Sequence, residues 1–270
     1  MTALPGPLWL IGCGNMGGAM LERWIADGVD PNAITVVTRS PRDVPPGVTH
    51  ATTIPQDGPP AIVVLAIKPQ QLDAIAVDLA PRIAGVPLLI SILAGVEEAA
   101  LAQRFDAATI VRAMPNLPVA IGQGVVALHS HGQDQGARTT AAALMAPLGL
   151  VEWINDAALF DAVTAMSGCG PGFVFRFIDA LAAAGTALGL PADQAQRLAI
   201  ATVEGSATMA AGSDAAPATL ADRVASPGGS TRQGLNVLDE GDALKRLLAA
   251  TLAASERRNA EMAAAARIAG

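Results

Sequence analysis

Two stretches of the chain carry residue types at spacings that could support chemistry. The first reads Gly12-x-Gly14-x-x-Gly17, and the second, over residues 226–231, reads Ser-Pro-Gly-Gly-Ser-Thr. The second stretch combines a proline that fixes φ with two glycines that permit a sharp turn, and hydroxyl groups surround that turn. If a helix begins near Ser230, its first N–H groups point outward and favour a small anion. An ordinary helix cap is an equally good interpretation of this segment alone.

The glycine spacing of the first stretch is weak alone, but its surroundings strengthen it. A short apolar run over residues 7–11 precedes it, and a helical pattern that ends near Gly28 follows it. In a dinucleotide-binding loop the first glycine allows the tight turn, the second lets the backbone approach a pyrophosphate, and the third lets the helix pack on the strand. The sequence therefore predicts a dinucleotide site whose loop consists of Gly12, Cys13, Gly14, Asn15, Met16 and Gly17.

An arginine follows the expected second strand, where NAD-binding sites usually carry Asp or Glu. The local sequence is Thr38-Arg39-Ser40, which contains no carboxylate. A guanidinium and neighbouring hydroxyls match the oxygens of a 2′-phosphate, so the prediction favours NADP (NADPH) over NAD. A solvated arginine at a strand end is the alternative.

Further candidate cofactor contacts follow later strands, on the carboxyl edge of the sheet where ligands bind. These residues are Ala66, Lys68, Ala94, Gly95, Met114 and Asn116. Asn116 could bond the nicotinamide ribose or hold a loop, and a local turn before Pro118 is an equally good interpretation.

Apolar segments alternate with helical patterns up to about residue 156. The expected strands cover residues 7–11, 33–38, 61–67, 87–92, 109–112, 125–128 and 150–153. Helical patterns between them cover residues 70–83, 97–104 and 138–145. This alternation predicts an α/β fold with an N-terminal doubly wound (Rossmann-type), mostly parallel sheet. Everything later reads as helix, so we expect a dinucleotide-binding domain over residues 1–158 and an all-helical C-terminal domain over residues 159–270.

The helical half is rich in alanine. Of 270 residues 51% are hydrophobic, yet only five Phe and three Trp are present and Tyr is absent. Helices expected over residues 170–187 and 192–211 are apolar on several sides and would be poorly covered in a lone subunit. We therefore expect a second subunit to cover them.

Charge and hydropathy exclude several classes of partner. The net charge is −7 without a basic block, which argues against a nucleic acid. No uninterrupted apolar run reaches the roughly 18–20 residues that span a bilayer, and no basic N-terminal lead is present. We expect a soluble, cytoplasmic protein that binds no membrane.

Cysteine and histidine usage predicts neither a disulfide nor a metal site. Cys13 and Cys169 are the only cysteines, and Cys13 reads as a small filler in the glycine-rich loop. His50, His129 and His131 are expected on the surface, without a carboxylate or thiol at metal-ligand spacing.

Six segments, taken in order, resemble the pyrroline-5-carboxylate reductase family over essentially the whole chain. They are Ile-Gly-Cys-Gly-Asn-Met-Gly at 11–17, Ala-Ile-Lys-Pro at 66–69, Ser-Ile-Leu-Ala-Gly at 91–95, Arg-Ala-Met-Pro-Asn-Leu-Pro at 112–118, Ser-Gly-Cys-Gly-Pro at 167–171, and the stretch at 226–231. The family usually has Ser in place of Cys169, Ala with an aromatic in place of Gly172-Phe173, and often two threonines where Ser230 and Thr231 stand.

The resemblance implies NAD(P)H-dependent reduction of a cyclic imino acid, 1-pyrroline-5-carboxylate, to L-proline, the last step of proline biosynthesis. It implies that Thr231 hydrogen-bonds the ring nitrogen. The substrate carboxylate would be bound by Ser226, Gly228, Gly229 and Ser230. It also implies a homodimer through the C-terminal helices, and the sequence leaves open whether dimers assemble into a ring.

Two other interpretations compete with this one. A 3-hydroxyacid dehydrogenase would need a lysine on the first long helix of the second domain, and residues 161–188 contain Arg176 but no lysine. A non-catalytic NADP-binding dimer would not need the turn at 226–231. Activity on six-membered cyclic imines stays open, because one methylene is worth only about 1–3 kcal/mol.

Overall fold

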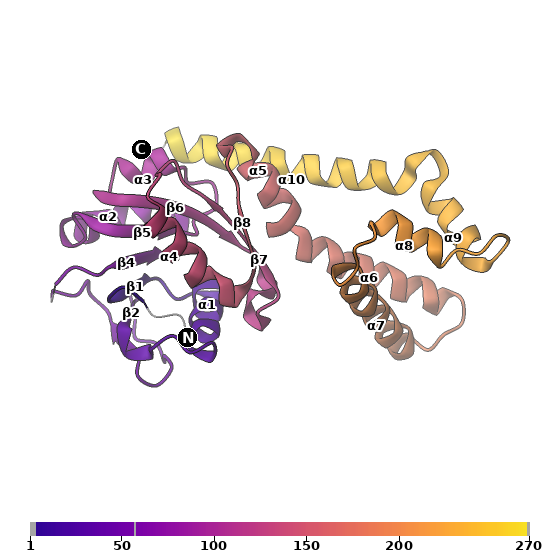
Figure 1. The fold of residues 1–270 in the computed structure, drawn as a ribbon, viewed down its shortest axis with the longest axis horizontal. Helices are drawn as coiled ribbons and strands as arrows, with labels where there is room; N and C mark the ends of the chain where they lie inside the picture. Colours follow the sequence, from indigo (N-terminus) through magenta and orange to yellow (C-terminus); the bar gives the residue numbers. More distant parts are fainter. Residues whose placement is uncertain (1–3, 57, 269–270) are drawn as a thin grey trace. The chain divides into compact units, whose positions relative to one another are not determined.

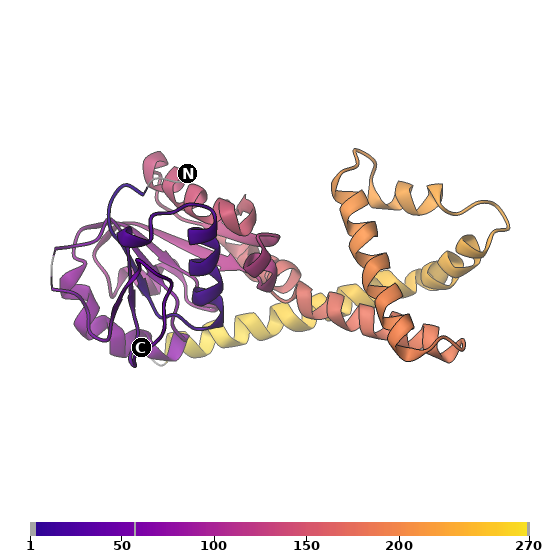
Figure 2. The same cartoon turned by 90° about the horizontal axis from the view of Figure 1, so that it is seen from below.

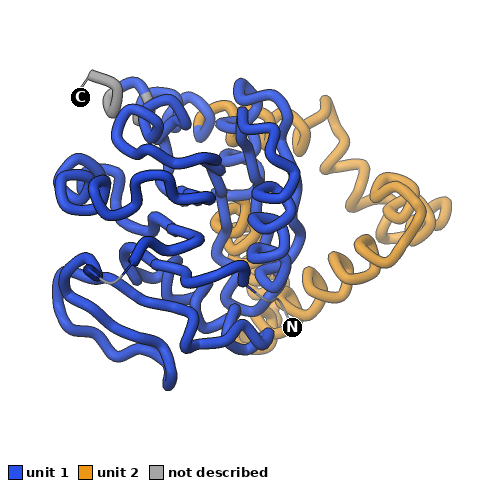
Figure 3. Tube along the Cα trace, turned by 60° about the vertical axis from the view of Figure 1, so that its left-hand side comes forward, with its two compact units in different colours: residues 1–169, 255–270 blue, residues 170–254 orange. Residues whose placement is uncertain are grey.

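A computed structural model describes residues 4–56 and 58–268, which divide into two compact units. Unit 1 comprises residues 1–169 and 255–270, and unit 2 comprises residues 170–254 (Figure 3). The division differs from the boundary expected at residue 158, because Phe160 is buried against the sheet with Met114 and Ala127. The C-terminal residues return to unit 1, where Asn259 Nδ2 lies 3.4 Å from the carbonyl oxygen of Asp161.

Unit 1 contains one eight-stranded sheet (Figure 1). Its strands are β1 (Leu8–Ile11), β2 (Ile34–Val37), β3 (Thr49–Ala51), β4 (Ile62–Leu65), β5 (Val86–Ser91), β6 (Ala107–Pro115), β7 (Gly124–His129) and β8 (Gly149–Trp153). The spatial order is β3-β2-β1-β4-β5-β6-β7-β8, and only the β6–β7 pair is antiparallel. The order reverses beside β1, which is a topological switch point of a doubly wound sheet. The predicted fold class is confirmed.

Two strands differ from the expectation. β3 was not predicted, because its three residues, Thr-His-Ala, form no apolar run and pair only with β2 at the sheet edge. β6 is longer than the predicted segment at 109–112, since it continues through Met114 to Pro115 and pairs with β7 there.

Helices cover both faces of the sheet, so its central strands are apolar on both sides. The α-helices of unit 1 are α1 (Asn15–Ala26), α2 (Leu72–Leu79), α3 (Glu98–Ala102), α4 (Gln135–Met145), α5 (Phe160–Val163) and the last part of α10 (Ala243–Ile268). Leu8 and Leu10 pack with α1 and α4, whereas Trp9 and Ile11 pack with α2 and α3. The helix expected over residues 70–83 is divided into α2 and short 3₁₀ turns at Pro69–Gln71 and Ala80–Arg82.

Unit 2 is entirely helical (Figure 2). It contains α6 (Gly170–Ala187), α7 (Ala192–Ala211), α8 (Pro217–Arg223), α9 (Ser230–Asp239) and the first part of α10 (Ala243–Ile268). The predicted limits of α6 and α7 are confirmed, because glycine and proline mark their ends. The two helices approach closely where a Cβ on Gly185 would lie 3.4 Å from the Cβ of Ala195.

Unit 2 leaves most of its apolar side chains exposed. Within residues 170–254, all of which the structure describes, only Ala195, Ala199 and Ala225 are buried. Exposed large side chains include Phe175, Phe177, Leu181, Leu188, Leu198 and Met209. The helices therefore lack a covered core in a single copy of the chain.

One helical stretch, residues 157–187, is long and apolar enough to cross a membrane by length and composition alone. The stretch contains no uninterrupted apolar run of that length, because Asp161, Arg176 and Asp179 divide it.

Candidate functional site

The glycine loop between β1 and α1 has the geometry of a phosphate cradle. Gly12 has φ +91°, and a Cβ there would lie 2.5 Å from the carbonyl oxygen of Ala66. A Cβ on Gly17 would lie 3.0 Å from the carbonyl oxygen of Gly12, so the helix packs directly on the loop. Gly14, in contrast, has open space beside it: nothing described lies within 4 Å of its added Cβ. Gly12 and Gly17 thus allow close packing within the protein, whereas Gly14 leaves open space beside the loop.

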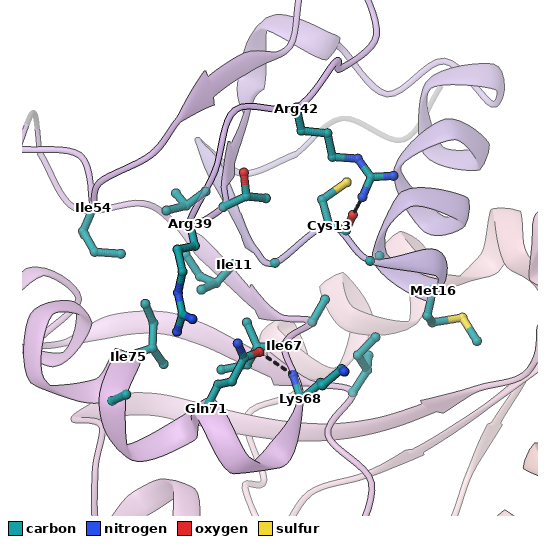
Figure 4. A pocket seen from close by; sticks show the side chains of 18 of the residues that line it. Ile11, Cys13, Met16, Arg39, Arg42, Ile54, Ile67, Lys68, Gln71 and Ile75 are labelled. Carbon is teal, nitrogen blue, oxygen red and sulfur yellow. Dashed lines mark hydrogen bonds between the residues drawn. The ribbon is translucent and has the colours of Figure 1, made fainter.

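A cavity of about 1420 Å³ opens beside this loop at the carboxyl edge of the sheet (Figure 4). The segments that follow β1, β2, β3, β4 and β5 line it, together with the last two residues of β6. Among the described residues that line this cavity, four are basic, Arg39, Arg42, Lys68 and Arg82, and one is acidic, Asp78. In a chain with a net charge of −7, this local excess of positive charge favours a polyanionic ligand.

Most of the predicted cofactor residues line this one cavity. They are Gly12, Cys13, Gly14, Asn15, Met16, Gly17, Arg39, Ser40, Ala66, Lys68, Ala94 and Met114. Gly95 and Asn116 are not among the lining residues, although both lie beside lining residues in the sequence.

The loop after β2 presents two arginines, of which the sequence singled out one. Arg39 extends toward Ile75, whereas the guanidinium of Arg42 donates to the carbonyl oxygen of Cys13 (Figure 4). The Thr38 hydroxyl holds this loop, lying 2.8 Å from the Ser40 carbonyl oxygen and 2.7 Å from His50 Nε2. No Asp or Glu of this loop lines the cavity. The sequence contained a signal for Arg42, because it is the second basic residue of the same loop.

Cys13 lies at the base of the loop as a neutral filler. Burial raises the pKa of its thiol above the ordinary value of 9.0, while the nearby Arg42 guanidinium acts in the opposite direction. A raised pKa keeps the thiol protonated at neutral pH, and a protonated thiol is a poor nucleophile. This agrees with the packing role expected from the sequence.

The side chain of Asn116 links separate segments of unit 1, and Asn116 is not among the residues that line the cavity. Its Nδ2 donates to the carbonyl oxygen of Ser167 at 2.9 Å, and its Oδ1 accepts from the Val125 amide at 2.8 Å. The residue is buried. Both side-chain partners are distant in sequence, so neither contact is the local turn before Pro118.

The Ser-Pro-Gly-Gly-Ser-Thr stretch forms a closed turn followed directly by a helix. The Gly229 amide donates to the Ser226 carbonyl oxygen at 3.0 Å, and Gly228 has φ +73°. A proline followed by a glycine of positive φ is typical of a type II turn. α9 begins at Ser230, so the amides of its first turn, including that of Thr231, have no acceptor within the helix.

The hydroxyl groups of this turn are accessible in a single copy of the chain. Ser226, Ser230 and Thr231 are all exposed. The turn is anchored from the side, because Arg232 pairs with Asp222 of α8 at 2.6 Å. The turn belongs to unit 2, whereas the cavity belongs to unit 1.

Cys169 follows a π-helical turn, Thr164–Gly168, immediately before α6. Its amide donates to the Thr164 carbonyl oxygen at 3.0 Å, and its side chain is half-buried. The hydrogen bond of Cys169 is thus made by its backbone, and no described residue forms a hydrogen bond with its thiol.

The expectation for His129 is wrong. It ends β7 opposite Arg112 of β6, inside the sheet, and only 2% of it is exposed. No carboxylate stands at metal-ligand spacing from these histidines in the sequence, but the fold brings Glu98 of α3 to 2.9 Å from His131 Nδ1. Long-range contacts of this kind leave no local signal in the sequence.

Similar proteins cover most of the chain. Residues 157–262 match the family model described as pyrroline-5-carboxylate reductase dimerisation, and residues 8–95 match that of the coenzyme F420-dependent NADP oxidoreductases. The pyrroline-5-carboxylate reductase of Pseudomonas aeruginosa is 37% identical over 203 residues, which cover 74% of each chain.

Two solved structures share the fold. A pyrroline-5-carboxylate reductase from Coxiella burnetii is 32% identical with a TM-score of 0.89, over 95% of this chain and 98% of the other. The Plasmodium falciparum pyrroline carboxylate reductase, solved with NADP bound, is 26% identical with a TM-score of 0.84, over 96% and 98% of the two chains.

Proposed function

We propose, since this chain belongs to the pyrroline-5-carboxylate reductase family, that it catalyses the NADPH-dependent reduction of 1-pyrroline-5-carboxylate to L-proline, the last step of proline biosynthesis. One observation supports the proposal: the chain contains two distinct segments that suit an anion. A basic cavity surrounds the glycine loop in unit 1, and an exposed helix-opening turn ends at Ser230 in unit 2. A reductase with a carboxylate-bearing substrate needs both.

The cavity fits a dinucleotide with a 2′-phosphate. The open space beside Gly14 accommodates a pyrophosphate against the backbone, at the first turn of α1. Arg39 and Ser40 would hold the 2′-phosphate, with Lys68 contributing further positive charge. These features support NADPH over NADH as the cofactor.

Residues of the turn would bind and orient the substrate. The amides of Gly228 and Ser230, with the hydroxyls of Ser226 and Ser230, would hold the carboxylate. The Gly229 amide donates to the Ser226 carbonyl oxygen. It therefore supports the turn, and the carboxylate would be bound by the neighbouring groups.

Thr231 would hydrogen-bond the ring nitrogen. Bound NADPH supplies the hydride that reduces the imine carbon. An alcohol is a poor acid at neutral pH, so Thr231 would orient the nitrogen or relay a proton to it while donor and acceptor carbons are held close.

A homodimer through the C-terminal helices completes the proposal. The apolar side chains left exposed on α6 and α7 need a partner surface, and both helices fall in the region that matches the dimerisation model. We assign the apolar stretch at 157–187 to this interface, because its charged residues, Asp161, Arg176 and Asp179, would be costly in lipid. In the proposed dimer the turn of one subunit serves the cofactor cavity of its partner. The enzyme would act in the cytoplasm.

A side-by-side substrate assay tests the proposal. NADPH oxidation would be followed with 1-pyrroline-5-carboxylate, 1-pyrroline-2-carboxylate and the six-membered cyclic imine. The expected result is the highest kcat/KM with 1-pyrroline-5-carboxylate. A higher kcat/KM with either other imine would assign the site to another substrate.

A further inference from the structure

We propose that Glu98, His129 and His131 form a binding site for one divalent transition-metal ion of the Zn²⁺ type. One ligand atom of each residue lies within 4.8 Å of the others. The three come from different segments of unit 1: Glu98 begins α3, His129 ends β7, and His131 lies in the connection to α4. None of them lines the cofactor cavity, so the site is separate from the proposed active site.

The orientation of the His129 ring carries the argument. Its Nδ1 lies 2.7 Å from the carbonyl oxygen of Ile154, which accepts hydrogen bonds only. Nδ1 of the neutral ring must therefore carry the proton, and the lone pair is at Nε2. That atom is buried, and no described residue offers it a hydrogen bond. A backbone carbonyl that fixes one imidazole nitrogen while the other keeps its lone pair is the usual arrangement of a metal-binding histidine.

The remaining two residues lie beside the His129 ring. The His131 ring lies edge-on to the His129 ring, with centroids 4.9 Å apart. A Glu98 carboxylate oxygen, Oε2, lies 2.9 Å from both the backbone amide and the Nδ1 of His131. Glu98 thus holds His131 beside His129 before any ion is bound, which lowers the entropic cost of assembling the site.

The ligand set selects the class of ion. Two imidazoles and one carboxylate suit Zn²⁺ and its neighbours in the first transition row, with remaining positions for water. Zinc bonds of about 2.0–2.1 Å place tetrahedral ligand atoms roughly 3.4 Å apart, so the present cluster must contract. The His131 side chain is 68% exposed and can make that adjustment, whereas His129 is fixed.

Charge around the cluster does not oppose a cation. Arg112 pairs with His129 across the β6–β7 ladder, and its guanidinium stacks on the Phe160 ring, 4.1 Å from the centroid. Burial lowers the pKa of Arg112, and the carboxylates of Asp161, Glu97 and Glu98 counteract that effect. The charge of this buried guanidinium is therefore offset by nearby carboxylates.

Direct metal titration of the untagged, full-length protein tests the proposal. After treatment with a chelator, Zn²⁺ would be titrated by calorimetry, and Co²⁺ by its visible absorption. The expected result is one ion per chain with a tetrahedral or five-coordinate Co²⁺ spectrum. Glu98→Gln and His131→Ala should each weaken Zn²⁺ binding by at least about tenfold. His131 is exposed, and Glu98→Gln keeps the size and shape of its partly buried side chain, so neither change should disturb the fold, whereas His129→Ala opens a buried space.

His50→Ala is the matched control, because His50 is the third histidine and bonds only Thr38 among the described residues. It should bind Zn²⁺ as the wild-type chain does. Absence of stoichiometric binding, or equal affinity in the wild type, Glu98→Gln and His131→Ala, would overturn the proposal. Because the readout is metal binding, it is independent of reductase activity.

Discussion

The amide of Gly229 donates to the carbonyl oxygen of Ser226, 3.0 Å away, and closes a turn directly before α9. Gly228 makes this turn possible with its positive φ of 73°. The turn ends where the helix begins, so the unpaired amides and the hydroxyls of Ser230 and Thr231 are presented together. The proposed chemistry depends on this arrangement.

Loss of the Thr231 hydroxyl should affect turnover more than cofactor binding. In Thr231→Ala we expect kcat to fall by roughly 10²-fold, with the NADPH dissociation constant nearly unchanged. Steady-state kinetics and fluorescence titration with NADPH measure the two quantities. Thr140→Ala on the exposed face of α4, where the hydroxyl bonds only the Gly136 carbonyl, serves as the control. Wild-type kcat in Thr231→Ala would remove this residue from the mechanism.

Substitutions of the two arginines in the loop after β2 should differ in their effect on cofactor selectivity. Arg39→Ala should weaken NADPH binding but leave NADH binding nearly unchanged, because only NADPH carries the 2′-phosphate. Arg42→Ala should weaken both, since Arg42 contacts the Cys13 carbonyl within the glycine loop. Dissociation constants for both cofactors test this. Equal losses with NADPH and NADH in Arg39→Ala would show that Arg39 only supports the loop.

Gly12 and Gly14 should respond differently to the same substitution. Gly12→Ala forces a Cβ to 2.5 Å from the Ala66 carbonyl oxygen at a positive φ, and should destabilise the fold by about 2 kcal/mol or more. In Gly14→Ala the added Cβ has no described atom within 4 Å. The free energy of unfolding should therefore match that of the wild type, while NADPH should bind more weakly. Urea unfolding and NADPH titration of both variants check this pair. A stable Gly12→Ala variant would contradict the packing role.

Asn116→Ala should lower stability rather than cofactor affinity. The change removes the bonds to the Ser167 carbonyl and the Val125 amide, at a cost of about 1–3 kcal/mol. The melting temperature should fall while the NADPH dissociation constant stays within about twofold. A large loss of affinity in a chain of unchanged melting temperature would instead place Asn116 at the nicotinamide ribose.

Cys13 should make stability depend on alkaline pH. Its thiol has a pKa of 9.0 when unperturbed, and burial raises that value in the folded chain. Below pH 9 both states hold the proton, and above it the unfolded chain releases the proton first, so stability falls as pH rises. Urea unfolding between about pH 8 and pH 10.5 should show a steeper loss for the wild type than for Cys13→Ala. Parallel curves would contradict the shift.

The parts of this fold that follow from local patterns could be predicted from the sequence. The central strands are continuous apolar runs, and glycine and proline mark the ends of α6 and α7, so both were foreseen. The glycine loop could also be placed, because strand, loop and helix are contiguous in the chain.

What could not be predicted depends on partners distant in sequence. The edge strand β3 exists only because β2 lies beside it. Asn116 acquires its role from Ser167, and His131 acquires a carboxylate from Glu98, 33 residues earlier. His129 looked like a surface residue until the antiparallel pairing of β6 and β7 placed it opposite Arg112. No local spacing reports such contacts.

The most direct measurement of the central claim is the stoichiometry of the reaction. The purified wild-type chain would be incubated with NADPH and 1-pyrroline-5-carboxylate, and both NADPH consumed and L-proline formed would be quantified. The account predicts equal molar amounts of the two, with turnover lost when Thr231 is replaced. NADPH consumption without L-proline, or no consumption by a folded chain, would contradict it.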